Sequence, residues 1–178
     1  MQSNQSNIIP YVNMNGSWTV SDQIMGSIFD QLVEDGIFQT VFYDGRIKGK
    51  TDFIEMMQSK ENLVQIILVN DKIIGITWLN GVSQNRAFSH FAFFKEAWGK
   101  YTNEMGKEVI KYWMGIQYEG KYLFDVLLGI IPIFNKRAHK FTQEVGYTRL
   151  GQIPYMSILA SGEKEPAEIF YYGREEPE

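Results

Sequence analysis

Residues 87–114 read AFSHFAFFKEAWGKYTNEMGKEVIKYWM, and this stretch decides how the rest of the chain is interpreted. Its first eight residues are mostly apolar and alternate between two faces, which is typical of a strand in a sheet. From Met105 to Trp113 apolar side chains recur at spacings of three and four, which predicts a helix packed on that sheet. A polar loop containing Gly99 joins the two. The stretch therefore predicts a strand, a loop and a helix in succession.

The loop in this stretch is suited to binding an anion. The first amides of a helix have no partner inside the helix, and the helix dipole places partial positive charge at the same end. Together they form a site suited to phosphate. Gly99 permits close approach of the backbone, and Lys95 and Lys100 add positive charge. On the loop alone a second interpretation stays open, in which Gly99 is an ordinary turn and the lysines are solvated surface.

The segments around this stretch predict a mixed α/β domain. Upstream, apolar runs joined by short polar turns predict an antiparallel meander of three strands that ends at Phe94. Downstream, the apolar run over residues 122–131 is interrupted only by Asp125 and Gly129, as in a strand covered on both faces. The expected elements, in chain order, are a helix over 21–35, a strand over 37–43, a short helix from 51, strands over 63–69, 73–79 and 87–94, a helix over 105–116, a strand over 122–131, a helix over 138–145, and strands over 147–159 and 167–172.

The composition is that of a globular protein with a single domain over residues 1–178. At 178 residues, with 44% apolar and 21% charged residues, the chain has the length and the balance of one ordinary domain. These values exclude a disordered chain, a collagen-like repeat and a coiled-coil rod. Residues 1–17, rich in Asn, Gln and Ser, are expected to form a loose lead-in, and residues 173–178 an acidic tail.

The cysteine and histidine content excludes several kinds of site. The chain contains no cysteine, so that it has no disulfide scaffold, thiolate zinc site or cysteine nucleophile. Its two histidines, His90 and His139, lie far apart in the sequence, and no histidine-rich metal site is expected. We expect His139 at the surface.

The net charge of −4 resides in the last eighteen residues. Residues 161–178 hold six acids against two bases, which leaves residues 1–160 balanced at 15 against 15. A nucleic-acid partner is not expected, because duplex binding requires a strongly basic patch. Residues 95–140 nevertheless hold eight bases against five acids, so that a small anionic ligand fits this part of the chain.

No segment predicts membrane insertion or export. The longest apolar run, over residues 126–134, is far shorter than the ~20 residues that span a bilayer. The N-terminal residues are polar and uncharged, unlike the start of a signal peptide. We therefore expect a soluble, cytoplasmic protein without a membrane partner.

Two motifs resemble those of the GNAT superfamily of acyl-CoA N-acyltransferases. Trp98-Gly99-Lys100 followed by Glu104 is similar to the Trp-Gly-Lys-Gly-x-x-Thr-Glu loop of the ribosomal-protein alanine acetyltransferase branch. Asn135-x-x-Ala138 is followed eight residues later by Gly146-Tyr147, as in many members. The resemblance covers about residues 20–160, with the elements in the same order. It implies a three-layer α/β (α+β) fold, with a mixed, mostly antiparallel sheet of six to seven strands and helices on both faces.

The resemblance also implies a cofactor, acetyl-CoA or another acyl-CoA, and no metal. The pyrophosphate would lie on the loop over residues 98–102, and the pantetheine arm would pair with the edge of the strand at residues 91–94, where it parts from the next strand. The residues expected to bind the cofactor are Phe93, Phe94, Trp98, Gly99, Lys100, Tyr101, Thr102, Asn135, Ala138 and Phe141.

The implied reaction is the attack of a primary amine of a small molecule, peptide or protein on the thioester, and the amine must lose a proton. His90 and Asp125 are the candidate bases. Each has a structural alternative: His90 satisfies a hydrogen bond on a half-buried sheet, and Asp125 marks the point where two strands separate.

Three residues depart from the family pattern. Glu96 stands where Gln or Arg is expected, Tyr101 where a small residue is expected, and Thr142 where many members have a tyrosine that acts as general acid. These departures favour an alternative function, a catalytically weak or inactive GNAT-like binding or assembly module, for which phage or prophage genomes are one setting. Whether the chain forms a homodimer is left open.

Overall fold

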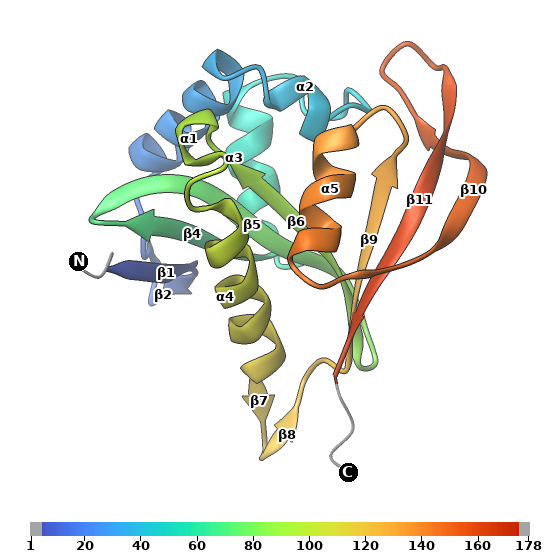
Figure 1. Cartoon of the computed structure of the whole chain (residues 1–178). Coiled ribbons are helices and arrows are strands. Elements are labelled where there is room, and N and C mark those ends of the chain that lie inside the picture. Colours follow the sequence, from blue (N-terminus) through green and yellow to red (C-terminus); the bar gives the residue numbers. More distant parts are fainter. Residues whose placement is uncertain (1–4, 175–178) are drawn as a thin grey trace.

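The computed structural model describes residues 5–174 and contains a central seven-stranded sheet with helices on both faces (Figure 1). The sheet has the strand order β1-β4-β5-β6-β9-β11-β10. Its strands are β1 (Ser6–Tyr11), β4 (Leu63–Val69), β5 (Lys72–Ser83), β6 (Arg86–Phe93), β9 (Val126–Pro132), β10 (Thr148–Ile158) and β11 (Lys164–Gly173). The remaining elements are the short strands β2 (Asn13–Met14), β3 (Ser17–Trp18), β7 (Gln117–Tyr118) and β8 (Lys121–Tyr122), the helices α1 (Asp22–Glu34), α2 (Phe38–Val41), α3 (Lys50–Gln58), α4 (Thr102–Gly115) and α5 (Lys136–Glu144), and the 3-10 turn η1 (Lys95–Ala97).

Two cores, one on each face of the sheet, give the molecule its three layers. Successive side chains of a strand point to opposite faces, so that Ile66 and Ile67 of β4 belong to different cores. Ile66 packs with Met25 of α1 and Phe53 of α3, whereas Ile67 belongs to the cluster that contains Trp113 of α4. The three-layer fold expected from the sequence is thereby confirmed.

The predicted meander is confirmed, and it leads to the one parallel pair among the described strands. β4, β5 and β6 are joined by short turns and pair antiparallel. β6 then pairs with β9 in parallel, since α4 lies in the connection between them. This parallel pairing covers only the closed end of the two strands, from Arg86–Val126 to Phe88–Leu128. Beyond that point β6 and β9 diverge.

The predicted strand over residues 37–43 is wrong, because this segment contains the short helix α2. Phe38 and Phe42 lie one helical turn apart, with ring centroids separated by 5.2 Å. Phe42 is buried and stacks on Trp78 of β5 at 5.9 Å. The apolar spacing of this short segment therefore belongs to a helix that lies against the sheet.

The N-terminal lead-in expected over residues 1–17 is also a misassignment. Residues 6–11 form β1, which pairs antiparallel with β4 from Ser6–Val69 to Tyr11–Val64 and covers its edge. Unpaired edge strands expose backbone hydrogen-bonding groups, and β1 satisfies those of β4. Residues 1–4 lie outside the described residues.

The two described residues of the acidic tail expected over residues 173–178, Gly173 and Arg174, belong to the folded domain. Gly173 ends β11, and the Arg174 guanidinium donates to the carbonyl oxygens of Met114 and Phe124. It also lies over the Tyr122 ring, 3.6 Å from the ring centroid. Residues 175–178 lie outside the described residues. Within residues 5–174, no helix combines the length and the apolar character that crossing a bilayer requires.

Candidate functional site: a cleft between β6 and β9

A cleft opens where β6 and β9 part beyond Phe88 and Leu128. It contains a larger cavity of about 590 Å³, bordered by α4 and α5, and a smaller one of about 230 Å³, bordered by the segment after α2. The two cavities adjoin, because six residues line both of them: Thr40, Val41, Phe91, Asn135, Ala138 and Phe141. Both therefore belong to the cleft beside β6.

The edge of β6 that faces this cleft has unpaired backbone groups. The Phe94 amide donates to the Ile74 carbonyl of β5, at 2.8 Å. Since bonded and non-bonded residues alternate along an antiparallel pair, the backbone groups of Phe91 and Phe93 point away from β5, toward the cleft. The Trp98 indole Nε1, which donates to the Phe93 carbonyl at 3.0 Å, agrees with this assignment. The Phe91 amide and carbonyl and the Phe93 amide are thus available to an extended ligand.

The loop that follows β6 presents the start of α4 to the larger cavity. Thr102 and Asn103, the first two residues of the helix, line that cavity. Met105 is the first residue whose amide reaches a carbonyl of the same turn, that of Tyr101, at 2.9 Å. The earlier amides of α4 have no intrahelical partner, and they form a candidate anion site. Gly99 has a φ of 69°, the left-handed conformation that glycine adopts most readily.

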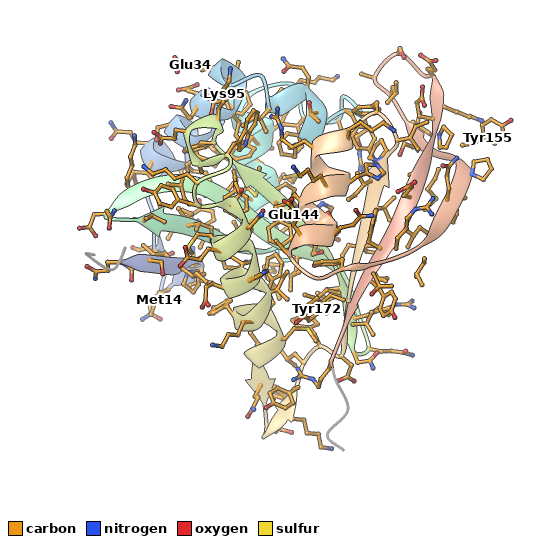
Figure 2. The ribbon with its side chains drawn as sticks, viewed as in Figure 1. Met14, Glu34, Lys95, Glu144, Tyr155 and Tyr172 are labelled. Carbon is orange, nitrogen blue, oxygen red and sulfur yellow. The ribbon has the colours of Figure 1, made fainter. Side chains whose placement is uncertain are left out.

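Positive side chains from α5 surround the larger cavity. Lys136, Arg137 and Lys140 line it, together with one acid, Glu144. Glu144, which is labelled in Figure 2, accepts from the Asn103 side chain at 2.9 Å and lies 3.7 Å from Lys140 Nζ, so that it is already engaged. The larger cavity is therefore electropositive overall.

Arg137 and Trp98 meet across the mouth of the larger cavity. The guanidinium carbon lies 3.3 Å from the centroid of the Trp98 ring, which is a close cation–π contact. The two residues join the N-terminus of α5 to the loop after β6. None of the three α5 cations was among the predicted site residues, although the excess of bases over residues 95–140 pointed to this region.

Solved structures share this fold at low sequence identity. Spermidine N-acetyltransferase from Vibrio cholerae, in complex with CoA and spermine, is 11% identical, with a TM-score of 0.70 over 95% of each chain. Ribosomal-protein-S5-alanine acetyltransferase from Vibrio fischeri is 10% identical, with a TM-score of 0.70 over 97% of this chain and 95% of that one. The chain has the GNAT fold.

A third match, the microcin C7 self-immunity acetyltransferase in complex with acetyl-CoA and AMP, is 13% identical, with a TM-score of 0.69 over 86% of this chain and 89% of that one. No family model matches the chain, and no curated protein matches it in sequence. The GNAT fold is therefore visible in the structure at identities of 8–13%.

Most residues expected to border a GNAT cofactor lie on the wall of the larger cavity. These are Phe93, Trp98, Gly99, Thr102, Asn135, Ala138 and Phe141. Asn135 caps α5, with its side-chain oxygen accepting from the Ala138 amide at 3.1 Å. Its carboxamide nitrogen is the part left to reach a ligand.

Three predicted cofactor residues do not line the cavity. The Phe94 side chain points to the opposite face from Phe93 and is buried in the core beneath α1 and α3. Tyr101 packs against the core under α4, and the Lys100 ammonium lies over its ring, 4.6 Å from the centroid. Gly99 of the loop and the α5 cations Lys136, Arg137 and Lys140 line the larger cavity instead.

The departures from the GNAT pattern do not close the cleft. Glu96 points away from the anion site and pairs with Lys72 at 2.5 Å. Tyr101 is absent from the walls of both cavities. Thr142 is buried and lines the smaller cavity. The cleft is open rather than filled by these side chains.

His90 lies in the smaller cavity, where β5 and β6 pair. Its ring stacks on Trp78 at 4.8 Å, and its Nε2 lies 3.0 Å from the side-chain oxygen of Asn80. Because that oxygen accepts, Nε2 carries the hydrogen and Nδ1 keeps its lone pair. Burial lowers the pKa of His90 from 6.5 to about 4, so that the imidazole is neutral at physiological pH.

This lowered pKa predicts a loss of stability in acid. As the pH falls below about 6.5, the unfolded chain binds a proton at His90 before the folded chain does, so that the loss builds up between pH 6.5 and 4. At pH 5 it amounts to about 2 kcal/mol, from 1.36 kcal/mol per pKa unit. Urea titrations at pH 7.5 and pH 5 give the unfolding free energy of the wild type and of His90→Gln. Between these two pH values we expect the wild type to lose about 2 kcal/mol more than the variant does. Equal losses of unfolding free energy in the wild type and in His90→Gln would contradict the lowered pKa of His90.

Asp125, the other predicted base, does not lie in the cleft. It precedes the closed end of β9, where its carboxylate accepts from the Asn85 side chain at 2.8 Å and lies 3.5 Å from Arg174 Nε. It is thus separated from the opening by the paired part of β6 and β9. Asp125 lines neither cavity, and its contacts hold the chain where β9 begins.

His139, expected at the surface, is largely buried, with 14% of its side chain exposed. Its Nδ1 lies 2.8 Å from Glu168 and its Nε2 3.1 Å from the Pro132 carbonyl. Both partners are oxygen atoms that accept hydrogen bonds. Hydrogen bonds from Arg149 and then His139 hold the pKa of the Glu168 carboxyl below its usual value. His139 therefore fastens α5 to the sheet.

The apex of the cleft contains a pair of hydroxyls that the sequence did not single out. Ser89 Oγ donates to the Leu128 carbonyl at 3.1 Å and lies 2.7 Å from Tyr147 OH, so that the tyrosine donates to the serine. Burial raises the pKa of Tyr147 far above its usual value. Both residues line the smaller cavity. The Gly146-Tyr147 motif was the only sequence signal for this pair.

Proposed function

We propose that the chain is an acyl-CoA-dependent N-acyltransferase that moves an acetyl group from acetyl-CoA to a primary amine. The observation that carries the proposal is the open cleft between β6 and β9, which joins the free amides of α4 to the unpaired edge of β6. Its larger cavity, at about 590 Å³, falls within the range of roughly 300–1,000 Å³ for ligand sites. Solved structures with the same fold are complexes with CoA or acetyl-CoA.

The chemistry of the larger cavity suits the donor. The diphosphate would be held by the amides of Thr102 and Asn103, with Lys136 and Arg137 supplying positive charge. The pantetheine arm has two amide groups, and these match the unpaired backbone groups of β6. Acetyl-CoA would therefore occupy the side of the cleft that α4 and α5 border.

The acceptor would enter from the smaller cavity and meet the thioester near Phe91, which lines both cavities. The amine nitrogen forms a bond to the acetyl carbon, the carbon–sulfur bond breaks, the nitrogen loses one proton, and the sulfur gains one as the CoA thiol. The Phe91 amide, which faces the cleft, is placed to polarise the thioester carbonyl, as oxyanion donors do. His90, with a free Nδ1 in the same cavity, is the proposed proton acceptor.

The proposal is tested by following thermal unfolding and thiol release in the presence of acetyl-CoA. Acetyl-CoA at 100 times its Kd is expected to stabilise the protein by about 2.7 kcal/mol. Because the chain has no cysteine, a thiol reagent added to the reaction reports the CoA product alone. No stabilisation at millimolar acetyl-CoA would contradict the proposal.

The second candidate, a GNAT-like binding or assembly module without catalysis, is favoured by one observation: Thr142 replaces the tyrosine expected as general acid. It predicts stabilisation by acetyl-CoA without thiol release for any amine. Amine-dependent thiol release would exclude it.

A further inference from the structure

The smaller cavity has almost no charge available to a cationic acceptor. Among its described lining residues the only carboxylate is Asp44. That carboxylate accepts from Arg46 Nε at 2.5 Å and from the Arg46 amide at 3.1 Å. Arg46 lines the same cavity, with 86% of its side chain exposed. The single acid is therefore paired, and a cation already stands at the entrance.

Three of the other polar side chains of the smaller cavity are also engaged. The Asn80 oxygen lies against His90, and the hydroxyls of Ser89 and Tyr147 bond to each other. Unlike the larger cavity, with its α5 cations and free amides, this half of the cleft has no excess of charge of either sign.

Aromatic and aliphatic side chains form most of the remaining wall. Trp78 stacks on His90, with ring planes 7° apart, and on Phe42, with planes 8° apart, so that three rings form a continuous stack. Val41, Met56 and Phe91 extend this surface. The indole surface is thus engaged with two neighbouring rings, which limits its use as a platform for a second ammonium.

These contacts discriminate between classes of amine. A polyamine carries several ammonium groups near pKa 10.4, and each charge that leaves water without a partner is costly. An aromatic or aliphatic body instead gains roughly 25 cal/mol for each Å² of apolar surface that it buries. We infer that the acceptor is an apolar monoamine, with one amino group on an aromatic or aliphatic body, and not a polyamine. This inference rests on the proposed acetyl transfer.

The test compares phenethylamine with spermidine as acceptors, by thiol release at pH 8 with saturating acetyl-CoA. We expect kcat/KM to be at least ten times higher for phenethylamine. Equal or faster turnover of spermidine would overturn the inference and leave the proposed function intact. Binding of acetyl-CoA without thiol release for either amine would instead contradict the transferase proposal itself.

A pair of charge-reversal variants tests the physical cause. Arg46→Glu leaves Asp44 unpaired and adds a second carboxylate at the entrance, and we expect it to raise kcat/KM for spermidine at least tenfold. The matched control is Arg86→Glu, an equal charge change at an exposed residue of β6 that lines neither cavity. An equal response of the two variants would overturn the assignment of selectivity to the Asp44–Arg46 pair.

Discussion

Replacing Thr102 with glutamate is expected to weaken acetyl-CoA binding about 100-fold without destabilising the fold. Thr102 is the first residue of α4 and lines the larger cavity. A carboxylate at a helix N-terminus stabilises the helix by about 0.3–1 kcal/mol, because it interacts with the free amides and the dipole. The same carboxylate would occupy the anion site and repel the diphosphate. A 100-fold loss corresponds to about 2.8 kcal/mol, at 1.4 kcal/mol for each factor of ten.

The matched control for this variant is Thr51→Glu. Thr51 lies in the first turn of α3, is exposed and lines neither cavity. Calorimetric titration with acetyl-CoA gives the two Kd values, and urea unfolding gives the two stabilities. Equal Kd values for the two variants would place the diphosphate elsewhere.

The central strands could be predicted because their signal is local. Residues 63–69, 73–79 and 87–94 are apolar runs separated by short polar turns, and the structure has strands at each of them. The helix after Gly99 was equally clear, since its apolar face repeats over three turns from Met105. The apolar pattern within each of these elements is sufficient to predict it, without information on the segments that it packs against.

The misassigned elements depend on contacts between distant parts of the chain. Residues 6–11 become a strand because β4 offers an open edge, and nothing within those residues identifies that edge. Residues 38–41 are too short for a periodic pattern, and the contact of Phe42 with Trp78 favours a helix there. In both cases tertiary pairing decides between conformations that the local sequence leaves open.

The site could be predicted in part for the same reason. The loop at Gly99 is contiguous in sequence, so that its backbone role followed from the pattern around it. Arg137 enters the site only because α5 packs beside the loop and brings its guanidinium over Trp98. Asp125 shows the converse, since the sequence left it either as a base or as the point where two strands separate, and the register of β9 places it before the paired end of the two strands instead.

The second large effect is expected at Gly75, where β5 and β6 approach closely. A Cβ atom at this position would lie 2.7 Å from the Ala92 carbonyl oxygen and 2.9 Å from the Phe93 Cα. Both are backbone atoms of β6, so that relief requires the strand to move rather than a side chain to rotate. Overpacking of this kind costs typically 1–3 kcal/mol, and the buried position of Gly75 leads us to expect about 3 kcal/mol for Gly75→Ala in urea unfolding.

Because Gly75 pairs with Phe93, the displaced segment is the one that presents the cleft edge of β6. Gly75→Ala is therefore expected to weaken acetyl-CoA binding as well as stability, which distinguishes it from an ordinary core defect. The matched control is Gly151→Ala in β10, where an added Cβ meets nothing within 4 Å. Alanine there restricts the unfolded chain and is expected to stabilise slightly, by roughly 0.4–1 kcal/mol. If both variants bind acetyl-CoA like the wild type while Gly75→Ala alone is destabilised, the donor does not lie along β6.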